Sequence, residues 1–99
     1  MDKKAFQITD GRGFHITFPN GITVSTQFGP GHYCENRYKE FKSFDGSDTC
    51  EVAIWREGIE GFITDKILTK AFGKSINSNG AYLGIKEWTK IIDYCSKLK

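Results

Sequence analysis

Apolar and polar residues alternate along the segment from Phe14 to Phe28, on both sides of the turn sequence Pro19-Asn20-Gly21. Alternation with a period of two is typical of strands that bury one face. A three-residue loop pairs Phe18 with Ile22 and unites the apolar side chains on one face, whereas a two-residue Asn-Gly loop would divide them between both faces. The sequence therefore predicts a hairpin with a type I turn and Gly21 in the left-handed position.

A shorter alternating segment precedes this hairpin, at residues 5–9. When Phe6 pairs with Ile16 and Ile8 with Phe14, the apolar side chains of three consecutive strands share one face. The first 28 residues thus predict a three-stranded meander.

Further strands are expected after a long irregular segment. Thr49–Arg56 alternates again, and Trp55 projects to the face opposite the apolar residues of this strand, which are Cys50, Val52 and Ile54. Gly61–Thr64 is a candidate for a short fifth strand. The apolar spacing of Asp65–Gly80 fits a short helix and an irregular segment equally well.

Apolar residues near the end of the chain recur with helical spacing, at Ile85, Trp88, Ile91, Ile92, Cys95 and Leu98. Gly84 is the predicted N-cap, and Glu87 falls in the first turn, where a carboxylate interacts favourably with the helix dipole. The predicted fold is α+β: a mainly antiparallel sheet of four to five strands, with the C-terminal amphipathic helix packed on one face, in a single domain of residues 1–99.

Composition narrows the class of protein. The formal charge is +2, with 14 basic against 12 acidic residues, which argues against a protein that grips duplex DNA. Three widely spaced cysteines and a start without a signal peptide indicate a reduced, cytoplasmic setting. No apolar run approaches the ~20 residues of a membrane span, so we expect no membrane partner. His15 and His32 are seventeen positions apart and no CxxC pair exists, so we expect neither a metal site nor a cofactor.

The segment 29–48 is long for a connection in a compact domain, and such loops often carry function. The turn sequence Gly29-Pro30-Gly31 is followed in the same segment by Arg37. Backbone N–H groups of the turn and the guanidinium of Arg37 can together bind an anion, or the glycines and the proline can simply turn the chain. Nearby aromatic residues can stack on a planar ligand or cover the sheet edge. We expect a ligand-binding site formed by Gln27, His32, Tyr33, Asn36, Arg37, Tyr38, Trp55 and Arg56.

No catalytic constellation is visible in the spacing of reactive residues. Cys34 and His32 lie two positions apart in one loop, whereas a nucleophile and its base normally come from separate elements. His15, on the polar side of its strand, has no carboxylate or nucleophile placed near it by the sequence. The sequence therefore predicts a binding protein, and a small hydrolase that uses Cys34 or His15 is an alternative.

The run FHITFPNGITVSTQFGPGHYCENR, followed by CEVAIW and a closing helix with a Trp, is similar to small uncharacterised proteins carried by bacteriophages and prophages. ITVSTQFGPGHYCENR is the most specific part. The resemblance implies an accessory protein that acts on host systems by binding. We expect a homo-oligomeric, non-catalytic counter-defence factor that sequesters a small anionic, nucleotide-like signalling ligand. The alternatives are an inhibitor that masks a host protein, and a small hydrolase or a single-stranded nucleic-acid binder.

Overall fold

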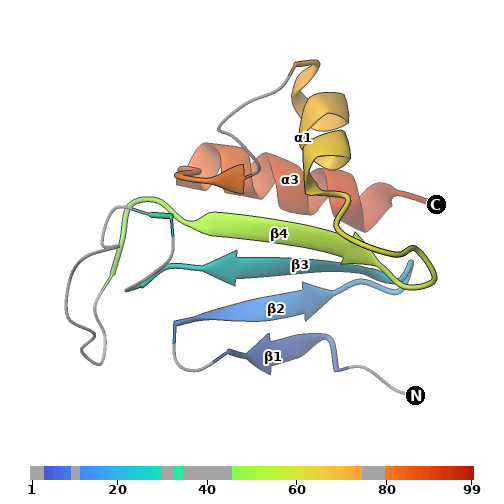
Figure 1. Cartoon of the computed structure of the whole chain (residues 1–99), viewed down its shortest axis with the longest axis horizontal. Helices are drawn as coiled ribbons and strands as arrows, with labels where there is room; N and C mark the ends of the chain where they lie inside the picture. Colours follow the sequence, from blue (N-terminus) through green and yellow to red (C-terminus); the bar gives the residue numbers. More distant parts are fainter. Residues whose placement is uncertain (1–3, 10–11, 30–32, 35–45, 75–79) are drawn as a thin grey trace.

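The computed structural model describes residues 4–9, 12–29, 33–34, 46–74 and 80–99 of the chain (Figure 1). Within these residues, four strands form one antiparallel sheet in the order β1-β2-β3-β4. The elements are β1 (Phe6–Ile8), β2 (Gly13–Thr17), β3 (Ile22–Gln27), β4 (Glu51–Arg56), α1 (Thr64–Phe72) and α3 (Ile85–Lys97). The predicted α+β fold, with a C-terminal helix packed on the sheet, is confirmed.

The central hairpin has the predicted register. Ile16 lies opposite Val24 across β2 and β3, and the Phe18 N–H donates to the Ile22 carbonyl at 2.9 Å beyond the strand ends. Gly21 has a φ of +86°, which a residue with a Cβ rarely adopts, and its N–H closes the turn onto the Phe18 carbonyl at 3.0 Å. The three-residue loop therefore unites the apolar side chains on one face, as its sequence indicated.

The core lies between β3, β4 and the two helices, on the apolar face of the sheet. Fully buried aliphatic side chains of β3 and β4 contact those of α1 and α3 there, and two thiols complete the cluster: Ile22, Val24, Cys50, Val52, Ile54, Ile67, Leu68, Leu83, Ile91 and Cys95. Each fully buried aliphatic side chain contributes ~1.5–3 kcal/mol of transfer free energy. Residues that lie 30 to 70 positions apart are thereby joined in one cluster.

The helices cover the β3 and β4 side of this face and leave β1 uncovered (Figure 1). β1 pairs with β2 as predicted, with Phe6 opposite Ile16 and Ile8 opposite Phe14. However, Phe6 is 75% exposed and Ile8 is 80% exposed. The apolar face is thus wider than the helix layer that covers it.

The segment that follows β4 differs from the expected fifth strand. Phe62 makes an isolated bridge with Trp55, and α1 then begins at Thr64. The Thr64 hydroxyl accepts the Ile54 N–H at 2.8 Å and so takes the place of a strand carbonyl. The helical alternative for the ambiguous segment is correct for residues up to Phe72, and residues 75–79 lie outside the described part of the chain.

Helix α3 begins as predicted, with Gly84 as N-cap and the Gly84 N–H donating to Glu87 Oε1 at 2.9 Å. Most of the apolar stripe packs inward, but Ile85 is 70% exposed because it lies in the first turn, past the edge of the core. Neither described helix combines the length and the apolar composition that crossing a bilayer requires.

The turn between β2 and β3 holds the other end of α3. Asn20 Nδ2 donates to the carbonyls of Cys95 and Leu98, both at 2.8 Å, and Asn20 Oδ1 accepts the Ile22 N–H at 3.0 Å. The last carbonyls of a helix lack intrahelical partners, so this side chain supplies donors that the helix cannot. The hairpin is therefore fixed to the C-terminus of the chain.

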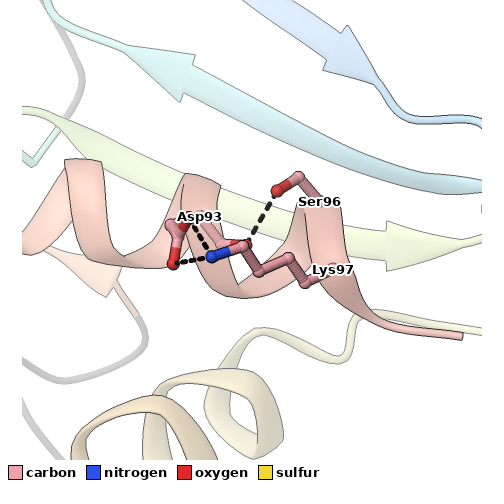
Figure 2. A network of polar contacts seen from close by, with 3 residues as sticks. All are labelled: Asp93, Ser96 and Lys97. Carbon is pink, nitrogen blue, oxygen red and sulfur yellow. Dashed lines mark hydrogen bonds and ion pairs between the residues drawn. The ribbon is translucent and has the colours of Figure 1, made fainter.

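The solvent side of α3 carries a small polar network (Figure 2). Lys97 Nζ lies 3.0 Å from Asp93 Oδ1, and the Ser96 hydroxyl donates to the Asp93 carbonyl at 2.8 Å. The two charged side chains are 74% and 61% exposed, so the pair is worth ~0.5 kcal/mol or less. This part of α3 is a solvated surface and provides a position for control substitutions.

Candidate functional site

The predicted ligand-binding residues divide into two groups. His32, Asn36, Arg37 and Tyr38 lie outside the described residues. The structure places the remaining residues, Gln27, Tyr33, Trp55 and Arg56, at three different locations.

Gln27 and Tyr33 lie at one end of the sheet. Gln27 pairs with Glu51 across β3 and β4, and the Tyr33 N–H donates to Glu51 Oε1 at 3.3 Å. The Tyr33 carbonyl accepts the N–H of Tyr82, whose φ of +52° is uncommon for a residue with a side chain. The Gln27 amide is already engaged, because it donates to Thr9 Oγ1 at 2.7 Å. Gln27 therefore has a structural role, in joining the end of β3 to the residue after β1.

Trp55 lies on the sheet face opposite the helices, as predicted, in an aromatic cluster with His15 and Phe62. The ring centroids of Trp55 and His15 are 5.1 Å apart at an interplanar angle of 83°. Those of Trp55 and Phe62 are 6.0 Å apart, and Phe62 is 73% exposed. The sequence suggests an acid or base or a surface residue at His15, whereas in the structure the His15 ring packs against Trp55.

Arg56 lies at the opposite end of β4 from Glu51, about 17 Å away along the strand. Its guanidinium donates to two backbone carbonyls, that of Asn20 at 3.3 Å and that of Lys99 at 2.7 Å. The structure therefore does not bring Arg56 together with Gln27 or Tyr33. These contacts give it a role in fixing the C-terminus to the hairpin turn.

A cavity that the sequence did not predict lies between β2, β3 and the first turns of α3, and we call it the Trp88 pocket. Its volume is about 280 Å³. It is lined by Phe14, Thr26, Phe28, Gly46, Ser47, Asp48, Thr49, Cys50, Leu83, Gly84, Ile85 and Trp88. Three of these side chains are aromatic, and Asp48 is the one charged side chain among them.

The aromatic wall of the Trp88 pocket is held in place by specific contacts. The indole Nε1 of Trp88 donates to Thr26 Oγ1 at 2.8 Å, and the Phe14 ring meets the indole edge-on with centroids 6.3 Å apart. Phe28 directly precedes the predicted loop, residues 29–48, and Gly46 lies near the end of that loop; both line the pocket. The pocket therefore lies at the base of the loop in which the sequence placed the site.

The three cysteine thiols are buried, and burial favours the protonated form of two of them, Cys50 and Cys95. Burial, and secondarily the nearby Cys34 thiol, raises the pKa of Cys50 to about 11 from 9.0. Burial raises the pKa of Cys95 to about 12. Cys34 itself is 1% exposed, and its Sγ lies 3.7 Å from the Gly29 carbonyl. The Cys34 thiol is thus enclosed by the protein, and this geometry gives no support to the hydrolase alternative at Cys34.

Among the described residues, no group of three or more His, Cys, Asp or Glu side chains is arranged to hold a metal ion. Comparisons with protein-family models, with curated proteins and with solved structures gave no match. The site must therefore be interpreted from its own chemistry.

Proposed function

We propose that this chain is a non-catalytic binding protein that sequesters a small nucleotide-like ligand and receives its base in the Trp88 pocket. The observation that carries the proposal is the aromatic cavity at the base of the predicted ligand-binding loop. Its volume of about 280 Å³ lies just below the ~300–1,000 Å³ of typical small-molecule pockets. A single fused ring system is therefore the part of a ligand that suits it.

The lining chemistry favours a nucleobase over a purely apolar group. Phe14, Phe28 and Trp88 offer aromatic surface, and stacking on such surface contributes ~1–3 kcal/mol per base. Asp48 adds a carboxylate, which accepts hydrogen bonds from the amino groups of a base. A pocket with three aromatic side chains and one carboxylate can thus distinguish a base from an aliphatic group.

The anionic part of the ligand is assigned to the loop, where the sequence places Arg37. Arg37 lies outside the described residues, so its assignment rests on the sequence pattern and on the position of the pocket at the base of the loop. The counter-defence setting within a phage rests on the resemblance of the segment ITVSTQFGPGHYCENR alone.

The test is calorimetric titration and native mass spectrometry of the purified chain with defined nucleotides, namely adenosine and guanosine monophosphates and their cyclic dinucleotides. Ser47→Trp adds a bulky side chain at the pocket wall, and Ser96→Trp makes the same change on the solvent side of α3. We expect Ser47→Trp to weaken binding at least about tenfold and Ser96→Trp to leave it unchanged.

Arg37→Ala tests whether Arg37 binds the anionic part of the ligand. The variant should bind the nucleotide more weakly but the parent nucleoside, which has no phosphate, equally well. Far-ultraviolet circular dichroism checks that each variant is folded. If the unmodified chain retains none of these nucleotides, or if Ser47→Trp binds them as well as it does, the proposed function is wrong.

A second function, the masking of a host protein, is favoured by the aromatic cluster of His15, Trp55 and Phe62. Exposed aromatic residues are enriched at the energetic centres of protein interfaces, and Phe62 is 73% exposed. This function predicts that Phe62→Ala abolishes a stable complex with a host protein in pull-downs while nucleotide binding is untouched. Loss of the complex in Ser47→Trp instead would assign the interface to the Trp88 pocket.

A further inference from the structure

The outer edge of β1 presents unpaired backbone groups. The Thr17 N–H donates to the Ala5 carbonyl at 2.8 Å and the Thr9 N–H donates to the Gly13 carbonyl at 3.1 Å, so the odd-numbered residues of this segment face β2. In an antiparallel ladder the intervening residues, Phe6 and Ile8, then direct their N–H and C=O groups away from β2. No hydrogen bond from a described residue reaches these groups.

The opposite edge of the sheet is closed. On β4, the Ile54 N–H donates to Thr64 Oγ1 at 2.8 Å and the Ile54 carbonyl accepts the Ile63 N–H at 2.8 Å. Cys50 and Leu83 exchange two backbone hydrogen bonds, of 2.8 and 2.9 Å, just before β4 begins. In the described part of the chain, β1 is therefore the edge that remains available for a further strand.

The side chains of β1 favour pairing of this edge with another strand. Natural edge strands usually carry a charge, a proline or a bulge that prevents pairing with another chain. The three residues of β1 are Phe6, Gln7 and Ile8, and both apolar side chains are at least three-quarters exposed. They continue the apolar face of Phe14 and Ile16 beyond the helices.

We propose that β1 pairs antiparallel with β1 of a second copy of this chain, about a two-fold axis at Gln7. In this register each Phe6 lies opposite the partner's Ile8, and the outward N–H and C=O groups of both residues make four hydrogen bonds. The register is self-complementary because one strand supplies both members of each pair.

The order of residues along this edge favours a second copy as the occupant. Phe6 and Ile8 lie at equal distances on either side of Gln7, and both side chains are largely exposed. Antiparallel pairing of two copies about Gln7 therefore sets one exposed apolar side chain opposite another on both sides of the axis.

The dimer joins the two sheets into one of eight strands. The apolar residues of both β1 and β2 strands then form one strip, with an α3 helix on either side of it. A pairing of three-residue strands is smaller than the ~800 Å² per partner of a standard interface, so the dimer is weak and concentration-dependent. The proposal is independent of nucleotide binding, because the β1 residues do not line the Trp88 pocket.

Sedimentation velocity of the purified chain from about 10 µM to about 1 mM tests this proposal. Ile8→Pro removes an outward N–H that makes no bond within the sheet, so the fold tolerates it. Ile8→Lys keeps the N–H and adds charge to the edge. Ile59→Lys is the matched control, because Ile59 is 51% exposed in the turn after β4.

We expect the unmodified chain and Ile59→Lys to dimerise as the concentration rises. Both Ile8 variants should weaken the dimer at least about tenfold while keeping the urea midpoint of a folded protein. A chain that stays monomeric at about 1 mM overturns the proposal and leaves the edge to a strand of another protein. Dimers unaffected by Ile8→Lys, or assemblies larger than a dimer, also overturn it.

Discussion

Replacing Asn20 with alanine tests whether the hairpin turn holds the end of α3. The side chain makes three hydrogen bonds, as donor to the carbonyls of Cys95 and Leu98 at 2.8 Å and as acceptor from the Ile22 N–H at 3.0 Å. Alanine removes all three and leaves two carbonyls at the helix end without these donors. The backbone of the turn should persist, because the left-handed residue is Gly21.

The expected loss of stability follows from the number of bonds. A net value of ~0.5–1.5 kcal/mol for each hydrogen bond gives about 3 kcal/mol for three. The free energy of unfolding of a domain this size is ~5–15 kcal/mol, so the variant should remain folded at 25 °C. Its melting temperature should fall by about 10–20 °C.

Urea denaturation followed by tryptophan fluorescence measures this change, and hydrogen exchange locates it. The amides of the last turn of α3 should lose protection before those of β3. Asn20→Asp is a useful comparison, because it keeps an acceptor for Ile22 but loses the donor and sets a carboxylate against two carbonyls. It should be destabilised at least as much as Asn20→Ala at neutral pH. A loss below about 0.5 kcal/mol in Asn20→Ala would refute the assigned role.

Two other changes test the edge of β4 and the buried thiols. Thr64→Val removes the acceptor of the buried Ile54 N–H at nearly constant volume and should cost ~1–3 kcal/mol in urea denaturation, while Thr64→Ser, which keeps the hydroxyl, should cost less. Because burial raises the pKa of Cys95 from 9.0 to about 12, the unfolded thiol ionises first, and stability should decline as pH rises above about 9. The free energy of unfolding from urea denaturation should decline less in Cys95→Ala than in the unmodified chain between pH 8 and 10, by roughly 1 kcal/mol. Equal declines in the two proteins would contradict this.

The fold was predictable wherever local pattern and register sufficed. The turn Pro19-Asn20-Gly21 admits one loop length that unites the apolar residues, and the structure has that register. The stripe from Trp88 onward fixed the position of α3, and Gly84 its start. These features depend on residues close together in the sequence, for which periodicity is informative.

The candidate site and the contacts around it depend on residues that are far apart in the sequence, and no local pattern predicts such contacts. Asn20 was predictable as a turn residue, but its contacts with Cys95 and Leu98 join positions 75 and 78 residues apart. Trp88 and Phe14 were each expected on the apolar face, but the pocket that they line also takes residues from the segment 46–50, far from both in the sequence. Arg56 was predicted to bind a ligand, but the carbonyls that accept its hydrogen bonds come from the turn and the C-terminal residue, distant in the sequence.

A single feature of the architecture accounts for both the Trp88 pocket and the open edge. Four strands span about 14 Å between the outermost backbones, whereas one helix with its side chains is about 10 Å wide. Helix α1 lies against β4, whose edge it closes, and α3 lies against β3, so β1 is left outside the helix layer (Figure 1). The apolar side chains of β1 therefore extend past the helix layer, although their alternation continues that of β2. Exposing Phe6 and Ile8 to water costs free energy that contact with another molecule recovers, so β1 is the part of the sheet best suited to intermolecular contact.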